Sequence, residues 1–557
     1  MNRHILILIT LLSIQFQKVL PSEVTENKIE HTLLTKAGKT NQNRSANCNM
    51  LIWGGGYSPS GNQVSLESNV RYFLRVRDKM RLTGFQTRIL FADGSDNARD
   101  IQFRDPEFLV PETNLLLAEM FGSTRGIYNQ YRNNNLEANG SSSIGELDKW
   151  FNYVNCSPSD SLNMIYFTGH GGKGEKKEPF NTTAHLWNNQ KVKVSDLAKK
   201  LDLLPMSQSV ILIMVQCYSG GFANFIFKDG NPKKELHQQP RAGFFATTHD
   251  RVAAGCTPDI KEANYQEYST KFWEALSGES RVGNQITKPD FNGDGRTSLS
   301  EAHAYVIINS KTIDIPIKTS DIFLRKYSEL NSTSDRKDSF NRRKKENIKS
   351  EDEILSSTID SNRSSVNENL PLVITSPISK ILRFASHESN ATIHALSERL
   401  VLEDEKRFEQ TNRKIDELKK TREELAKTKK QKEEQCKDLK NKIKERLRVQ
   451  WPELANIHHP IVDQLKKDVL PAKLLSVANK NNQWQDFKRL KKEISSIENQ
   501  RFLIEKNQVL AMRLKNEIEN VVLRQNLLKS KQVQIIERFL QLESLERITL
   551  DQFSVRR

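Results

Sequence analysis

The chain of 557 residues lacks the features that identify disulfide-rich scaffolds and phosphate-loop enzymes. It has five cysteines, too few and too scattered for a disulfide framework: Cys48, Cys156, Cys217, Cys256 and Cys436. A single pairing of Cys156 with Cys256 in an oxidising compartment stays open. Gly54-Gly55-Gly56 is not followed by Gly-Lys-Ser/Thr, so these glycines do not form a phosphate loop.

Beyond the N-terminus, no apolar run is long enough to cross a membrane. Residues 1–22 are predicted to be a signal peptide, with Arg3 and His4 ahead of an apolar core from Ile5 to Ile14. That core is too short to span a bilayer comfortably. The prediction is therefore a secreted or periplasmic protein with a polar leader over 23–47. Anchoring by an uncleaved signal is the alternative.

Apolar residues make up only 36% of the chain, which is low for a globular protein, and the net charge is +16. Charged residues crowd the second half, so we expect a globular first half and an extended second half. The basic runs 427–432 and 488–492 have no aromatic platform or groove-reading motif beside them, and they are interpreted as solvated helix faces. Nucleic-acid binding is not expected.

Two apolar runs end in reactive side chains. The run Met164-Ile165-Tyr166-Phe167-Thr168-Gly169 leads to His170, and the run Val210-Ile211-Leu212-Ile213-Met214-Val215-Gln216 leads to Cys217. Both are typical of buried parallel strands. Helical spacing over 194–204 predicts a crossover helix between them, so both strands should end at one sheet edge, where open α/β sheets bind ligands.

His170 and Cys217 suit nucleophilic catalysis. A cysteine attacks a carbonyl as its thiolate, and a nearby histidine can take the proton. The N–H groups of Gly171 and Cys217 are candidate oxyanion donors. Both side chains could instead be ordinary core residues, since a lone cysteine often is. Two such residues, each ending a strand and followed by glycines, favour the catalytic interpretation.

The sequence around these residues resembles the caspase-like cysteine peptidases, in particular legumain and the glycosylphosphatidylinositol transamidase. The similar stretches are the eight residues from Ile165 to Gly172, then Phe244 to Thr248, Arg251, Ala254-Gly255-Cys256 and Tyr268-Ser269. The spacing agrees as well, because Cys217 follows His170 by 47 residues and caspases separate the two by about 50. The resemblance covers roughly 48–310.

The resemblance implies a three-layer α/β sandwich of the caspase–hemoglobinase type with a mainly parallel sheet, here assigned to 48–327. The residues agree, since strand patterns at 50–53, 87–91 and 243–248 alternate with helical patterns at 66–80, 144–153 and 265–276.

A pocket for the substrate residue before the cut (P1) is expected beside the nucleophile. Its candidate residues are Gln216, Asp250 and Ser269. Legumain has Glu two residues before the cysteine, and this chain has Val215 there. Arg251 matches an arginine of legumain and is interpreted as structural. We expect a small polar or basic P1 residue and poor cleavage after Asp.

Residues 290–301 match the calcium-loop pattern D-x-[DN]-x-[DN]-G-x5-E in full. Oxygen ligands would come from Asp290, Asn292, Asp294, the Arg296 carbonyl, Ser298 and Glu301. The alternative is an acidic turn that caps the following helix through Ser298 or Ser300. No organic cofactor is expected.

The C-terminal part is predicted to be a flexible linker over 328–390 and a helical coiled coil over 391–557. Heptad-spaced apolar residues suggest two long helices, 396–449 and 484–545, folded into an antiparallel hairpin that is separable from the first domain. They are Val401, Phe408, Ile415, Leu418, Leu425, Leu439, Leu514, Val521, Leu528, Ile535 and Leu542. Within this linker, residues 370–384 form a short apolar segment that we expect to dock on one of the domains. The hairpin could self-associate or bind a protein partner, and the resemblance to legumain implies that it could block the site.

Three functions remain open from the sequence. The first is a secreted cysteine endopeptidase that acts on protein or peptide substrates through an acyl-enzyme. The second is a transamidase, which differs only in using an amine to release the acyl group. The third is a non-catalytic scaffold that acts through its helical tail, against which the intact His170 and Cys217 argue.

Overall fold

The structure of this protein is a computed structural model that describes residues 48–158, 161–330, 371–467 and 469–554. The predicted signal peptide (1–22), the leader (23–47) and most of the predicted linker (331–370) lie outside the described residues. Among the described helices, none is both long enough and apolar enough to cross a membrane.

A mixed, mainly parallel sheet confirms the predicted α/β class. Its strands run in the order β10-β9-β8-β5-β1-β2. Their bounds are β1 Cys48–Gly55, β2 Phe85–Phe91, β5 Leu162–Gly172, β8 Ser209–Met214, β9 Arg241–Phe245 and β10 Ile317–Lys318. All neighbours in this order are parallel except β10, which pairs antiparallel with β9.

Alternation along the strands creates two apolar cores, one on each face of the sheet. Met50 and Ile52 of β1 point into one core, and Leu51 and Trp53 point into the other. Helices α2 (Val64–Lys79), α6 (Tyr268–Ser277) and α7 (Leu299–Asn309) cover the first face. Helices α4 (Ile144–Asn155), α5 (Val194–Asp202) and α8 (Thr319–Tyr327) cover the second. The result is the three-layer arrangement expected from the sequence.

Strands β5 and β8 are direct neighbours, as predicted, and α5 lies on the connection between them. The crossover also contains a short β-ribbon that the sequence pattern does not reveal. Its strands are β6 (Thr183–His185) and β7 (Lys191–Lys193), and β6 pairs with the end of β5. A second ribbon, β3 (Ile101–Phe103) with β4 (Gln130–Arg132), and helix α3 (Glu112–Phe121) lie between β2 and α4.

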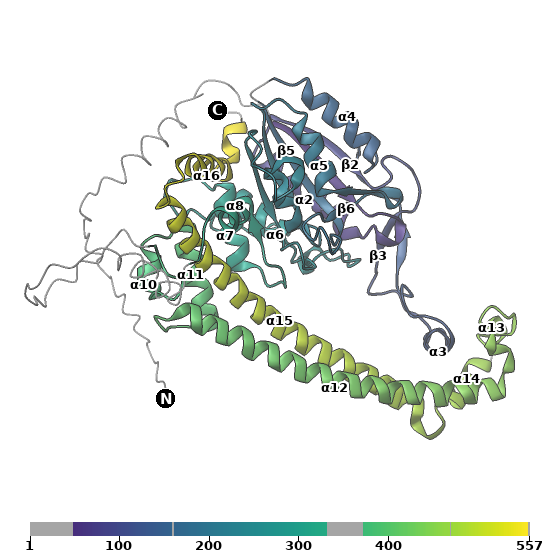
Figure 1. Cartoon of the computed structure of the whole chain (residues 1–557). Coiled ribbons are helices and arrows are strands. Elements are labelled where there is room, and N and C mark those ends of the chain that lie inside the picture. The colour runs from purple at the N-terminus through teal and green to yellow at the C-terminus, as the bar shows by residue number, and fades with distance from the viewer. Residues whose placement is uncertain (1–47, 159–160, 331–370, 468, 555–557) are drawn as a thin grey trace, which may run out of the picture. The chain divides into compact units, whose positions relative to one another are not determined.

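The helical region contains the predicted antiparallel hairpin, formed by α12 (Arg407–Gln450) and α15 (Gln483–Leu528), which run side by side in Figure 1. Ion pairs Arg422–Glu505, Lys429–Glu498 and Lys432–Glu493 join the two helices. Shorter elements flank the hairpin: α10 Ile378–Leu382, α11 His387–Leu400, η7 Pro452–Ala455, α13 Ile461–Gln464, α14 Leu470–Ala478, η8 Lys480–Asn482, α16 Val533–Glu546 and η9 Leu550–Phe553.

Several boundaries differ from the prediction. The first long helix is broken at Val401, which has a positive φ of 54° and an exposed side chain, so it is not a core residue of a heptad. The second is broken between α15 and α16. The described end of the predicted linker, 371–390, holds α10 and the start of α11, and Leu372, Ile374, Ile378 and Ile381 pack into a buried cluster with α11 and α15. The expected docking of 370–384 is thus observed over 371–384.

The C-terminal helices complete the cores of the α/β domain, contrary to the expectation of a separable hairpin. Leu523 and Leu527 of α15 and Phe539 and Leu542 of α16 belong to the second core. Leu550 and Phe553 belong to the first core. The heptad spacing in 514–542 therefore reflects burial against the α/β domain and α11 as much as against α12.

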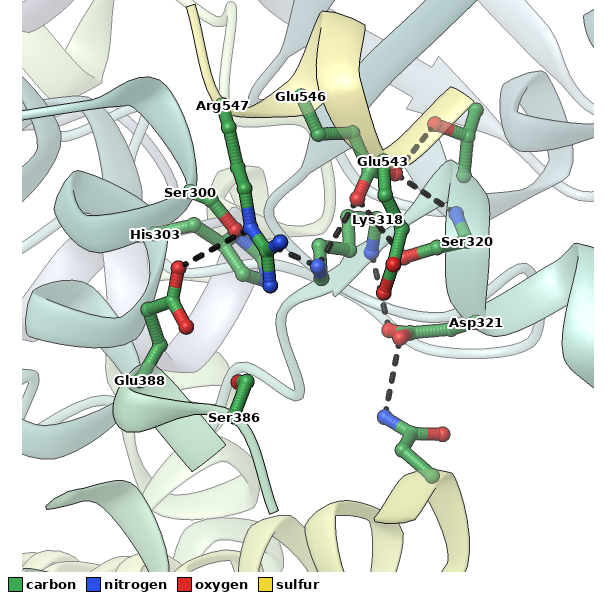
Figure 2. A network of polar contacts seen from close by, with 12 residues as sticks. Ser300, His303, Lys318, Ser320, Asp321, Ser386, Glu388, Glu543, Glu546 and Arg547 are labelled. Carbon is green, nitrogen blue, oxygen red and sulfur yellow. Dashed lines mark hydrogen bonds and ion pairs between the residues drawn. The ribbon is translucent and has the colours of Figure 1, made fainter. Parts of the chain in front are cut away.

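Buried charges fix α16 to the α/β domain (Figure 2). The carboxylate of Glu546 is fully buried and accepts hydrogen bonds from Thr319 Oγ1 (2.8 Å), Ser320 N (2.7 Å) and Ser320 Oγ (2.8 Å). Lys318 Nζ lies 2.9 Å from the same carboxylate. Because Ser320 N belongs to the first turn of α8, Glu546 also neutralises the positive end of that helix.

Candidate active site

His170 is held by an acceptor pair that sets its tautomer. Its Nε2 lies 2.8 Å from the Gly61 carbonyl and 2.9 Å from Gln63 Oε1. Both partners are acceptors, since the Gln63 amide nitrogen donates to Gln102 Oε1 and to Ser60 O. Nε2 therefore carries the proton, and Nδ1 keeps a free lone pair that can accept one.

Cys217 lies in a sharp turn three residues after β8. Tyr218, the next residue, has a φ of 59°, which is unusual for a bulky side chain and typical of a locally constrained site. The Ala253 N–H donates to Cys217 Sγ at 3.3 Å. The N–H of Cys217 itself donates to no acceptor in another described residue, so it is available to a ligand.

The backbones that carry the two residues meet. A Cβ added to Gly171 would lie 2.1 Å from the Cys217 carbonyl oxygen, so only glycine fits beside the cysteine. No hydrogen bond joins the two side chains within the described structure. A cavity of about 360 Å³ opens beside His170, and it is lined by Tyr57, His170, Gly171, His185, Asn189, Gln190 and Lys191.

Burial keeps both members of the pair uncharged near neutral pH. It lowers the pKa of His170 below its ordinary value of 6.5, although the hydrogen bond to Gly61 acts in the opposite sense. It raises the pKa of the Cys217 thiol above 9.0 against the effect of the Ala253 N–H, and the charge of Asp314 raises it further. Resting Cys217 is therefore a thiol, and a reaction that used it as a nucleophile would need a base to take its proton.

His185 shares this cavity but is a poorer base. Burial, Lys191 and His170 lower its pKa to about 4. His249, which follows β9, packs against Phe180 with ring centroids 4.3 Å apart and the ring planes tilted by 42°. Neither ring has the paired acceptors that orient His170.

The three predicted P1-pocket residues differ in their surroundings. Gln216 and Ser269 are buried, and Gln216 Oε1, Gln216 Nε2 and Ser269 Oγ have no hydrogen-bond partner within the described structure. Asp250 is exposed and accepts a hydrogen bond from Thr248 Oγ1. Arg251 pairs with Glu505 at 3.3 Å and donates to the Ile313 carbonyl at 3.5 Å.

Four contributors to the site escaped the sequence analysis: Gly61, Gln63, Ala253 and Asp314. Gly61 and Ala253 act through backbone atoms, which leave no signature in residue type. Gln63 and Asp314 lie far along the chain from both reactive residues, in segments with no motif. Asp314 is fully buried and accepts a hydrogen bond from Ala254 N at 2.6 Å.

The acidic loop 290–301 forms the capping turn that was the alternative to a metal site. Glu301 is buried, and its carboxylate accepts hydrogen bonds from Phe291 N, Asn292 N, Ser298 N and Ser298 Oγ. Ser298 caps α7 in return. Asp290 accepts from Asp294 N and Gly295 N. No group of three or more His, Cys, Asp or Glu side chains among the described residues is arranged to hold a metal ion.

The donor set nevertheless fits Ca²⁺ in kind, because every predicted ligand offers an oxygen. Asp290, Asn292 and Asp294 are exposed at the turn. For Glu301 to coordinate Ca²⁺ in bidentate mode, its carboxylate would have to give up the hydrogen bonds from the backbone N–H groups of Phe291, Asn292 and Ser298.

No protein-family model matches the chain, and no curated protein does. A solved structure, protein GSU0716 from Geobacter sulfurreducens, aligns with 47% of this chain and 88% of its own at 10% identity and a TM-score of 0.26.

Proposed function

We propose that this protein is a cysteine endopeptidase in which Cys217 is the nucleophile and His170 the general base. The observation that carries the proposal is the arrangement at the sheet edge. Neighbouring strands β5 and β8 deliver the two residues to the same edge, and the Gly61 carbonyl occupies Nε2 of His170 so that Nδ1 remains free. The fold type we propose is the caspase–hemoglobinase sandwich, on the strength of the sequence resemblance around His170.

The proposed reaction proceeds in two halves. Cys217 Sγ forms a bond to the scissile carbonyl carbon while its proton passes to His170 Nδ1. The N–H groups of Gly171 and Cys217 hold the oxyanion, and His170 then gives the proton to the leaving amine as the C–N bond breaks. Water, activated by the same imidazole, hydrolyses the thioester and regenerates the thiol.

For specificity we propose a small polar or basic P1 residue. Gln216, directly before the nucleophile, and Ser269 supply buried polar atoms that have no hydrogen-bond partner among the described residues. Arg251 could otherwise bind an acidic P1 side chain, but its guanidinium is engaged by Glu505. An aspartate at P1 would therefore find the Arg251 guanidinium already paired.

The experiment that tests the proposal is labelling with peptide acyloxymethyl ketones that differ only at P1. Attachment to Cys217, located by mass spectrometry, in wild-type protein and not in His170→Ala would support it. Reagents with Asn, Ser or Lys at P1 should label faster than the reagent with Asp. Labelling that ignores the peptide and follows cysteine exposure alone, with Cys156 ahead of Cys217, would contradict it.

The pH dependence of hydrolysis should follow His170. A base must be unprotonated, so kcat/KM is present above the pKa of His170 and is lost as the pH falls through it. Because burial lowers that pKa, the acid limb of the profile should have its midpoint below 6.5. His185→Gln should leave the limb in place. A midpoint above 7 would show that His170 is not the titrating base.

We also propose that loop 290–301 binds one Ca²⁺ that stabilises the fold without entering the reaction. A ligand that binds only the folded state at 100 times its Kd adds about 2.7 kcal/mol of stability. The melting temperature should therefore rise by several degrees between chelator and excess calcium, and Asp290→Asn should remove the rise. Equal melting temperatures in the two buffers would leave the loop as a capping turn.

A further inference from the structure

Arg513 of α15 binds a loop of the α/β domain through its whole guanidinium. The side chain is buried, and its nitrogens donate to the carbonyls of four residues, one in the last turn of α7 and three in the loop between α7 and β10. The acceptors are Asp314 O (2.7 Å), Ser310 O (3.0 Å), Ile307 O (3.1 Å) and Thr312 O (3.2 Å). A planar fork that satisfies four carbonyls fixes the path of the loop, and lysine could not replace it.

The loop that Arg513 holds is connected to Cys217 through hydrogen bonds to residues 253 and 254. Its Asp314 carboxylate accepts the Ala254 N–H at 2.6 Å. The preceding N–H, that of Ala253, donates to Cys217 Sγ at 3.3 Å. One hydrogen bond therefore separates the Arg513-bound loop from the segment that contacts the sulfur.

A second contact from α15 holds the other end of the same segment. Glu505 pairs with Arg251, and Arg422 of α12 holds Glu505 from the far side at 2.9 Å. The Arg251 carbonyl accepts the Tyr218 N–H at 2.8 Å. Segment 251–254 is thus fixed at both ends by the helical hairpin while it touches both Cys217 and its neighbour.

We propose that α15 is a working part of the active site, in which Arg513 and Glu505 are positioning residues that keep the Ala253 N–H on Cys217 Sγ. A donor to the sulfur favours the thiolate that attacks the substrate. The inference rests on the proposed function, since it assigns Cys217 a nucleophilic role. It reverses the inhibitory role that the resemblance to legumain implied, because loss of the hairpin contacts lowers reactivity.

The groups that face Cys217 are consistent with this role. The charge of Asp314 raises the pKa of the Cys217 thiol. Burial raises the pKa of Asp314 itself to about 6, and the Arg513 guanidinium acts in the opposite sense. Cys256, half-buried and two residues after Ala254, donates to the Gly169 carbonyl and stays neutral because desolvation raises its pKa. His170 is the remaining titratable neighbour on the β5 side.

The test is the rate of alkylation of Cys217 by iodoacetamide against pH, followed by mass spectrometry of the Cys217 peptide in the full chain. In Arg513→Gln the Ala253 donor is no longer held, and the thiol pKa should rise by about one unit. The thiolate population then falls about tenfold, and the more basic thiolate gains about threefold in intrinsic reactivity, so the rate at pH 7.5 falls about threefold. Glu505→Gln leaves the hydrogen bonds of Arg513 intact, so the alkylation rate should fall by a smaller factor.

Two variants control the measurement. Arg538→Gln removes an arginine of α16 that donates to the carbonyls of His237 and Gln238, away from Cys217, and should leave the rate unchanged. Asp314→Asn keeps the acceptor for Ala254 and removes the charge, so it should raise the rate. A general loosening of the fold would not produce opposite signs.

The outcomes separate this inference from the proposed function. Folded Arg513→Gln and Glu505→Gln proteins with wild-type rates at every pH would overturn the positioning role and leave the nucleophile standing. A wild-type Cys217 that alkylates only after denaturation would overturn the nucleophile and the positioning role together. A faster reaction in both variants would restore the inhibitory interpretation of the hairpin.

Discussion

Replacing Cys217 by alanine is expected to lower the kcat/KM for peptide hydrolysis by at least about 10⁴-fold. Replacing His170 by alanine should lower it by about 10³-fold or more, because the thiol would then lose its only oriented base. The double variant should be no worse than Cys217→Ala, since the two residues act in one step. Initial rates on a fluorogenic peptide, measured beside melting curves, check this prediction.

The chain offers matched controls for both substitutions. Cys156 is exposed and precedes the start of β5, the end of that strand opposite His170, and Cys156→Ala should retain wild-type activity. His185 shares the cavity with His170, and His185→Ala should lose far less than His170→Ala. If His185→Ala were inactive and His170→Ala active, the general base would be His185 of β6 and not His170 of β5.

Glu546→Ala is expected to lower the free energy of unfolding by about 3 kcal/mol. The substitution removes the carboxylate that pairs with Lys318, and it leaves the Thr319 and Ser320 donors without their acceptor (Figure 2). Breaking a buried pair costs about 3–5 kcal/mol, and the lower end applies because the Lys318 side chain is 24% exposed. Urea denaturation followed by circular dichroism measures the change.

Glu537 provides the control, since it lies exposed on the same helix. Glu537→Ala should change the free energy of unfolding by less than about 0.5 kcal/mol. Glu546→Gln should fall between the two, because the amide keeps an oxygen for Ser320 but not the charge for Lys318. Equal stabilities of Glu546→Ala and Glu537→Ala would mean that α16 is not fixed to the α/β domain by this network.

Local patterns were sufficient to predict the sheet and to place His170 and Cys217 at one of its edges. The runs before His170 and Cys217 are apolar because both faces of β5 and β8 are covered, and continuous runs of this kind report burial directly. Helices α2, α4, α5 and α6 follow from helical spacing within one or two turns, and α7 follows from the capping residues of the acidic loop before it. The adjacency of β5 and β8 follows from the short crossover and its handedness.

The helical region shows where such patterns mislead. Leu514 and Val521 have heptad spacing, yet they pack with α10 and α11 residues and face the α/β domain rather than forming a simple two-helix seam. Periodicity reports that one face of a helix is buried and does not report what covers it. Lys318 and Glu546, which join the two regions, are 228 residues apart in sequence and belong to no motif.

For the candidate site, the positions of His170 and Cys217 could be predicted, and the groups that contact them could not. His170 and Cys217 stand out by residue type and by position at strand ends. The Gly61 carbonyl and the Ala253 N–H are backbone groups, which every residue carries. Their placement depends on long-range packing of loops, which no local spacing encodes.

The most direct test of the account is to trap the acyl-enzyme. A peptide ester mixed with the protein and quenched in acid within the first turnover should leave an adduct with the mass of the acyl group. The account predicts a thioester on Cys217, cleaved by hydroxylamine and missing from Cys217→Ala. Peptide hydrolysis with the adduct on another residue, or with none in either protein, would contradict it.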